Sequence, residues 1–136
     1  MRRTAREARR LRLATEILFA YLHARRAMRR APLASVLAEL RKPPRRRPAR
    51  RAQSSLVEAR DLGVAVARTL ALVPGDTRCL ARSLVLGALL ARRGIPATLV
   101  IGAHAAPSFR AHAWVEHAGQ PVLSPGDGTF GRLVEL

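Results

Sequence analysis

The hydrophobic pattern of this chain changes once along its length, near Pro96. Before that proline, apolar residues recur three and four positions apart, which is the spacing of one face of an α-helix. After it come short runs of β-branched residues in alternating settings, which are typical of strands. A series of helices followed by a series of strands predicts an α+β domain with a small antiparallel sheet.

Two basic amphipathic helices are expected at the N-terminus, over residues 11–30 and 33–40. Residues 41–51 are rich in Pro and Arg and lack apolar periodicity, so we expect a linker or an exposed loop there. We therefore divide the chain into a basic N-terminal arm with its linker, residues 1–51, and a second folded unit, residues 52–136.

Two further helices are expected before the change of pattern. Ser55 and Glu58 have the spacing of a capping box, so the third helix is expected to begin at Ser55. Asp76 or Thr77 is expected to cap a fourth helix, and Gly94 fits the left-handed position that ends it.

Three strands are expected after the helices, over residues 97–102, 109–116 and 130–136. The dipeptide Ala118-Gly119 is expected to turn the chain into a hairpin after the second of these strands. Strands joined in sequence in this way predict an antiparallel meander.

The formal net charge of +16 is concentrated in the N-terminal arm, which carries 17 Lys and Arg against 3 Glu. A basic arm suits nucleic acid, anionic lipid or an acidic peptide as partner. However, 24 of the 25 basic residues are Arg and alanine is abundant, so a solvated face that reflects a GC-rich genome is an equal alternative. Aromatic residues are scarce in the arm (Phe19 and Tyr21), which weakens nucleic-acid binding, whereas residues 11–30 could contact a membrane surface.

No apolar run of the sequence is long enough to cross a bilayer. The N-terminal apolar stretch contains Glu16, and no small-residue cleavage site follows it, so we expect no secretory signal and a cytoplasmic protein. Cys79 is the one cysteine of the chain, so no internal disulfide can hold the fold.

Cys79 is the first of two candidate catalytic residues. It falls in the first turn of the expected fourth helix, where unpaired amides and the helix dipole stabilise a thiolate. Such a thiolate can attack a carbonyl carbon, and the neighbouring amides can receive the developing oxyanion. The alternative is that Cys79 is a small buried residue at the head of a core helix.

His112 is the second candidate, and it lies on the strand expected at 109–116. There it shares one face with Trp114 and Glu116 and could approach a helix packed on the sheet, where it would exchange a proton with the thiol. The alternative is a half-buried histidine that is satisfied by a backbone carbonyl. Glu116 lies roughly 13 Å along the strand and is a poor orienting partner, while Trp114 either lines the cleft or packs in the core.

A metal site would have to draw on Cys79, His104, His112 and His117. Zinc needs three or four converging donors. His112 and His117 have opposite strand parity, so their side chains are expected on opposite faces of the sheet. We therefore expect neither a metal nor a cofactor.

Taken together, three segments resemble the protease domain of the lasso-peptide biosynthesis B proteins. They are the helix Cys79-Leu-Ala-Arg-Ser-Leu-Val-Leu-Gly-Ala-Leu-Leu-Ala-Arg-Arg-Gly94, the strand Ala97-Thr-Leu-Val-Ile-Gly102 and the strand Phe109-Arg-Ala-His-Ala-Trp-Val-Glu116. The resemblance covers residues 55–123 well and residues 11–40 loosely. It implies a transglutaminase-like, papain-like cysteine protease core in residues 52–136. Because the arm is too short and too basic to be a leader-recognition domain, the chain resembles the stand-alone leader peptidase.

The resemblance also implies a Cys–His–(Asp) site, with Cys79 as nucleophile and His112 as base. The third residue of the family is an Asp that falls here at Ser124, and the nearest acid is Asp127, which we take as the third member. Ser124, or no third residue at all, is the alternative. The implied reaction is removal of the leader from a precursor peptide. The implied partners are a separate PqqD-like leader-recognition protein and an ATP-dependent lasso cyclase, with no nucleic acid.

Two other functions stay open from the sequence. Transfer of the acyl group to an amine, as transglutaminases do, would use the same acyl-enzyme as hydrolysis. A non-enzymatic basic module that binds peptide, RNA or a membrane surface would not need Cys79.

Overall fold

The computed structural model describes residues 2–40, 52–74, 79–104, 109–123 and 131–135. Its elements are α1 (Arg2–Met28), α2 (Leu33–Leu40), α3 (Ala52–Ala71), α4 (Cys79–Arg92), β1 (Thr98–His104), β2 (Arg110–His117), β3 (Gln120–Pro121) and β4 (Gly131–Glu135). The change from helices to strands falls between α4 and β1, as the sequence predicts. The expected α+β architecture is therefore confirmed.

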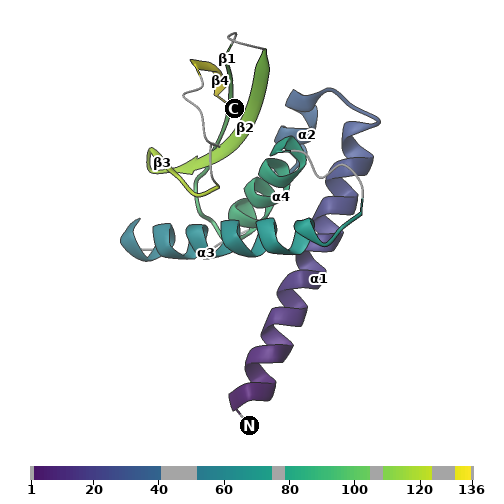
Figure 1. Cartoon of the computed structure of the whole chain (residues 1–136), viewed down its shortest axis with the longest axis vertical. Helices are drawn as coiled ribbons and strands as arrows, with labels where there is room; N and C mark the ends of the chain where they lie inside the picture. Colours follow the sequence, from purple (N-terminus) through teal and green to yellow (C-terminus); the bar gives the residue numbers. More distant parts are fainter. Residues whose placement is uncertain (1, 41–51, 75–78, 105–108, 124–130, 136) are drawn as a thin grey trace.

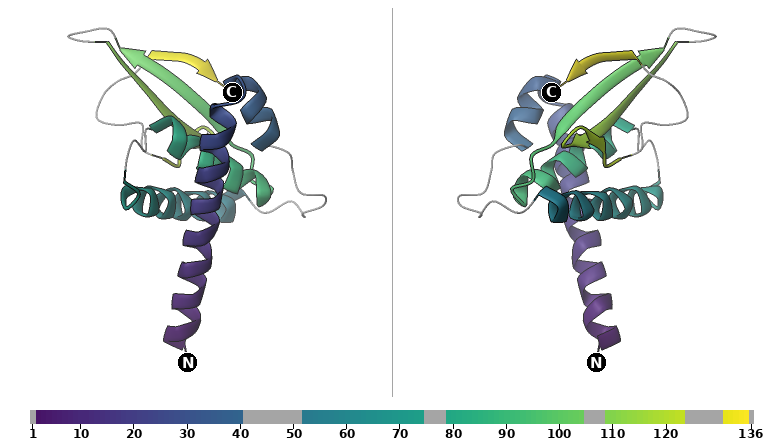
Figure 2. Two further views of the ribbon diagram at one scale, coloured as in Figure 1. Left: turned by 90° about the vertical axis from the view of Figure 1, so that its right-hand side faces the viewer. Right: turned by 90° about the vertical axis from the view of Figure 1, so that its left-hand side faces the viewer.

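The helices gather on one side of a small antiparallel sheet, and the N-terminal part of α1 extends away from the rest (Figures 1 and 2). The strand order is β3-β2-β1-β4. The predicted meander is wrong in one respect, because β4 pairs with β1 and not with β3. β3 is only two residues long, so a further strand could pair with little of it. β1 is seven residues long and offers a longer edge for pairing.

Helix α4 is the centre of the fold, because it contacts α1, α2, α3 and the two longest strands. A helix covered on several sides must be apolar around most of its circumference. The fully buried large side chains of α4 accordingly follow one another almost without a gap: Leu84, Val85, Leu86, Leu89 and Leu90. β1 and β2 meet this core through Leu99, Ala113 and Val115, which alternate with the outward-facing positions of their strands.

Helix α1 belongs to the same core, to which it contributes Ile17, Ala20, Tyr21 and Ala24. The basic arm therefore supplies buried apolar surface as well as charge. Within the described part of the chain, no helix is both long enough and apolar enough to cross a membrane.

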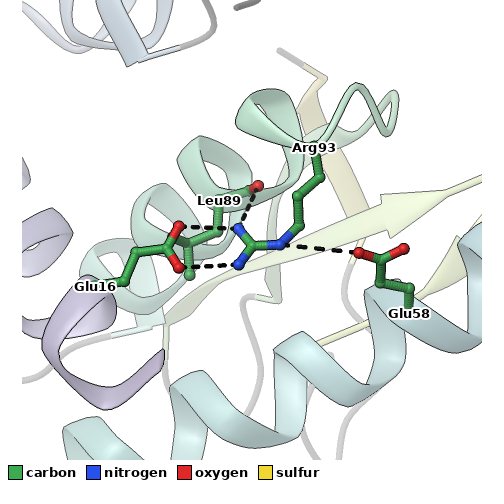
Figure 3. Close-up of polar contacts among 4 residues, drawn as sticks. All are labelled: Glu16, Glu58, Leu89 and Arg93. Atoms are coloured by element: carbon green, nitrogen blue, oxygen red, sulfur yellow. Dashed lines mark hydrogen bonds and ion pairs between the residues drawn. The ribbon is translucent and has the colours of Figure 1, made fainter. Parts of the chain in front are cut away.

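Arg93 joins three helices at the C-terminal end of α4 (Figure 3). Its Nη1 and Nη2 donate to the two carboxylate oxygens of Glu16 on α1, at 3.0 and 2.9 Å. Its Nε lies 3.9 Å from Glu58 on α3, and Nη1 also donates to the carbonyl of Leu89. The Arg93 side chain is only 18% exposed, so this bidentate pair is screened less by water than a surface ion pair.

The predicted capping box at Ser55 is wrong, because α3 begins at Ala52. Ser55 therefore lies inside the helix, where it is buried and forms a hydrogen bond of 2.9 Å with Nε2 of His117 on β2. The other ring nitrogen, Nδ1, donates to the carbonyl of Pro96 at 2.6 Å. The Ser55 hydroxyl, which the sequence pattern predicts to cap the helix, instead bonds to His117 on β2. The expected cap at Asp76 or Thr77 and the linker 41–51 lie outside the described residues.

The two predicted turns are confirmed by their backbone angles. Gly94 ends α4 with φ of 68°, in the left-handed region that glycine enters without steric cost. Ala118 and Gly119 have φ of 51° and 74° and join β2 to β3. Paired positive φ values match the right-handed twist of the flanking strands in a tight hairpin.

Gly63 lets α3 approach the segment that follows β3. A Cβ atom placed on Gly63 would lie 1.9 Å from the carbonyl oxygen of Val122, far inside van der Waals contact. A glycine inside a helix costs about 0.5–1 kcal/mol relative to alanine. Glycine is therefore required at position 63 by the close approach of Val122, despite its low helix propensity.

We predict opposite effects of alanine at the two glycines of the helix interiors. Gly63→Ala should lower the free energy of unfolding by about 1–3 kcal/mol, because α3 and Val122 must separate. Gly87→Ala on α4 meets no atom within 4 Å and should raise the free energy of unfolding by about 0.5–1 kcal/mol. Chemical denaturation of both variants measures the two values. A stable Gly63→Ala protein would contradict the close packing of α3.

Candidate active site

Cys79 is the first residue of α4 and lies against the edge of β2. The backbone N–H of Ala113 donates to its Sγ at 3.4 Å. Further along the same edge, Val122 donates to the carbonyl of Val115 at 2.9 Å, and β3 pairs with Glu116 and His117. The sulfur therefore lies at the part of the β2 edge that β3 does not pair with.

Cys79 and His112 line the same cavity, which has a volume of about 670 Å³. Its walls come from α3, the start of α4, β2 and the segment after β3, and its lining residues are Gly63, Val64, Ala67, Cys79, Arg82, Ala111, His112, Ala113, Val122 and Leu123. The fold thus brings together two residues that are 33 positions apart in the sequence. The lining is mostly small and apolar.

On the strand face that carries His112, two buried side chains follow along β2. The His112 imidazole stacks on the Trp114 indole, with ring centroids 6.2 Å apart and planes inclined by 21°. The indole Nε1–H donates to Oε1 of Glu116 at 2.9 Å. Arg132 on β4 donates to Oε2 of Glu116 at 2.7 Å, and Glu135 accepts from the same guanidinium at 2.7 Å.

A family model described as the transglutaminase-like superfamily matches residues 18–134. The chain belongs to this superfamily. The transglutaminase-like superfamily includes cysteine proteases, so the match is consistent with a nucleophilic thiol. Neither the curated proteins nor the solved structures give a significant match to the chain.

The surroundings of the sulfur suit the nucleophile of a transglutaminase-like cysteine protease. A helix N-terminus and an N–H donor are the features that stabilise thiolates in proteins, and both lie at Cys79. Backbone N–H groups of this kind can donate hydrogen bonds to the oxyanion that forms when a thiolate attacks a carbonyl. The catalytic roles of Cys79 and His112 stay predictions.

Sequence patterns predicted part of this candidate site and missed part of it. The parity of β2 correctly placed His112, Trp114 and Glu116 on one face. It gave no hint of Arg132, because the position of Arg132 depends on β4 pairing with β1. It also missed the Ala113 amide, since a backbone group carries no residue-specific signal.

Trp114 is the residue whose two sequence interpretations the structure separates. It is 5% exposed, yet it lies outside the main core cluster formed by the helices and the inner sheet face. Val100 on β1, fully buried, occupies the register position opposite Trp114. Trp114 is therefore a buried aromatic that lies opposite Val100 and stacks on the candidate base.

The third member predicted for the site, Asp127, and its alternative, Ser124, lie outside the described residues. His104 and His117 were weighed as metal ligands beside the site. In the described segments, no group of three or more His, Cys, Asp or Glu side chains is placed to hold a metal ion. His117 bonds to Ser55 and Pro96, whereas His112 stacks on Trp114.

Glu116 keeps its charge although it is buried. Burial raises the pKa of the Glu116 carboxyl, but hydrogen bonds from Trp114 and Arg132 and the charge of Arg132 outweigh burial and set the pKa below its ordinary value of 4.5. Arg132 responds in the opposite direction: its hydrogen bond to Glu116 raises the pKa of the guanidinium. Glu116 is therefore an ionised carboxylate with a hydrogen bond to each oxygen.

We predict that Glu116 makes the protein sensitive to acid. A lowered carboxyl pKa contributes stability that is fully present above about pH 4.5 and is lost as the pH falls from there through the native pKa. Glu116→Gln should therefore lose less stability than the wild type between pH 5 and about pH 3. Denaturation midpoints over this range measure the slope. The control is Glu135→Gln, which removes an exposed carboxylate from the same arginine and should keep the wild-type slope.

Proposed function

We propose that this protein is a cysteine protease that removes the leader from a lasso-type precursor peptide. The Cys79 thiolate attacks the carbonyl carbon at the leader–core junction, and His112 holds the thiol proton. The C–N bond breaks, and the imidazolium gives that proton to the amine of the core. Water then hydrolyses the thioester, which releases the leader as a free acid and restores the thiol.

One observation carries the proposal: Cys79 at the start of α4 and His112 on β2 line one cavity, with the Ala113 N–H at the sulfur. A nucleophile at a helix N-terminus, a base from an adjacent strand and nearby backbone donors are the parts that acyl transfer needs. Membership of the transglutaminase-like superfamily supports the same class of chemistry.

The choice of a lasso precursor as substrate rests on the likeness of residues 79–94, 97–102 and 109–116 to the protease domain of lasso-peptide B proteins. We accordingly propose a separate PqqD-like protein that presents the leader and an ATP-dependent cyclase that takes up the freed core. α1 supports the idea of a partner, because Leu11, Phe19 and Leu22 are at least 58% exposed on a helix rich in Arg. A membrane surface at residues 11–30 is the alternative use of the same helix.

We predict that Cys79→Ser and His112→Ala each abolish cleavage of a precursor peptide and leave the fold intact. Cys79 is only partly buried and His112 lies at the cavity wall, so neither change removes core volume. Mass spectrometry of the products measures cleavage, and circular dichroism measures the fold. A leader that ends in a free carboxylate marks hydrolysis, whereas a leader joined to an added amine would indicate amide transfer and contradict the proposal. Full function of Cys79→Ala in a reconstituted pathway would favour the non-enzymatic binding module.

Asp127→Asn should slow cleavage without abolishing it. An orienting carboxylate fixes the tautomer of the base and stabilises its cation, so its loss leaves a working but less efficient Cys–His pair. Asp61→Asn on α3 is a control that changes a carboxylate away from the Cys79 cavity. Equal rates for Asp127→Asn and the wild type would move the third role to another residue.

A further inference from the structure

The carboxylate of Glu116 is the anchor of a chain of contacts that ends at His112. Glu116 is 8% exposed, and its oxygens accept separately from the Trp114 indole and from Arg132. A buried carboxylate is costly unless it is paired and hydrogen-bonded, and here both conditions are met. The bond from the indole fixes the rotation of the Trp114 ring, which in turn faces the imidazole of His112.

The sheet register explains how Arg132 reaches β2 from a strand that is not its neighbour. His112 pairs with Gly102 on β1, and Gly102 pairs with Arg132 on β4, so the three residues form one row across the sheet. Gly102, between the other two, has no side chain. The Arg132 guanidinium meets Glu116, two strands away.

We propose that Trp114, held by Glu116 and Arg132, is a positioning residue that fixes the imidazole plane of His112 toward Cys79. This inference rests on the proposed cysteine chemistry. The stack engages the face of the imidazole, whereas proton transfer uses the ring nitrogens at its edge. An aromatic ring whose own rotation is locked restricts the imidazole more tightly than a ring that can turn.

The first test measures the imidazole directly by NMR. The aromatic ring current of Trp114 should shift the resonances of the carbon-bound protons of the His112 ring. Trp114→Leu should abolish this shift. Glu116→Gln should reduce this shift, because the indole loses its charged anchor. Glu135→Gln, which leaves the indole bond intact, should not. Resonances of His112 that are identical in the wild type, Glu116→Gln and Trp114→Leu would overturn the proposal.

The second test measures the rate at which iodoacetamide alkylates Cys79, and needs no precursor peptide. Glu116→Gln and Trp114→Leu should each slow alkylation roughly 10-fold, because a misplaced base no longer pairs with the thiol. Trp114→Phe keeps a flat ring facing His112 but lacks the indole N–H that Glu116 holds, so it should also slow alkylation, by less than Trp114→Leu does. Glu135→Gln should alkylate as the wild type does. Wild-type alkylation rates in both Glu116→Gln and Trp114→Leu would refute the proposal that Trp114 positions the His112 ring.

The two readouts separate failure of this inference from failure of the proposed function. If His112→Ala is alkylated as fast as the wild type, the Cys79–His112 pair does not operate and the proposed function fails. The NMR shift then still decides whether Glu116 orients the ring of His112 through Trp114. Thermal unfolding identifies a variant that has lost its fold, and if Glu116→Gln is such a variant, Trp114→Phe and Trp114→Leu carry the comparison.

Discussion

The site depends on the meeting of the N-terminus of α4 with the edge of β2. The hydrogen bond from the Ala113 amide to Cys79 marks this junction, and it holds the sulfur beside the strand that carries His112. The position of the sulfur is therefore set by how α4 lies on the sheet. α4 itself contacts α1, α2, α3 and the two longest strands. A helix packed on several sides cannot slide or rotate without disturbing all of its neighbours, because protein interiors are close-packed.

Both ends of this arrangement are fixed by polar contacts from other helices. At the far end of α4, Arg93 is held by Glu16 and approached by Glu58 (Figure 3). At the end of β2, His117 bonds to Ser55 on α3. α3 also forms one wall of the cavity, where Gly63 allows the close approach to Val122. The cavity is thus bounded by elements that are each tied to the core independently.

The sequence predicted features that depend on neighbours along the chain and missed those that depend on contacts across it. The left-handed glycine after α4, the turn at Ala118-Gly119 and the shared face of His112 and Trp114 follow from local geometry, and all were found. Ser55 had the local signature of a helix cap, but His117 competes for its hydroxyl. The placement of β4 beside β1 could not be read from strand patterns, which carry no information on pairing partners. The position of Arg132 followed from that pairing.

The contact between Glu16 and Arg93 also has a consequence for the order in which the molecule assembles. The two residues are 77 positions apart, and Ser55 and His117 are 62 positions apart. Helical chains rich in local contacts fold fast, whereas closing long loops slows the search for the native state. On the ribosome, α1 emerges long before its partner on α4 exists. The face of α1 that packs on α4 therefore stays uncovered until α4 has been synthesised.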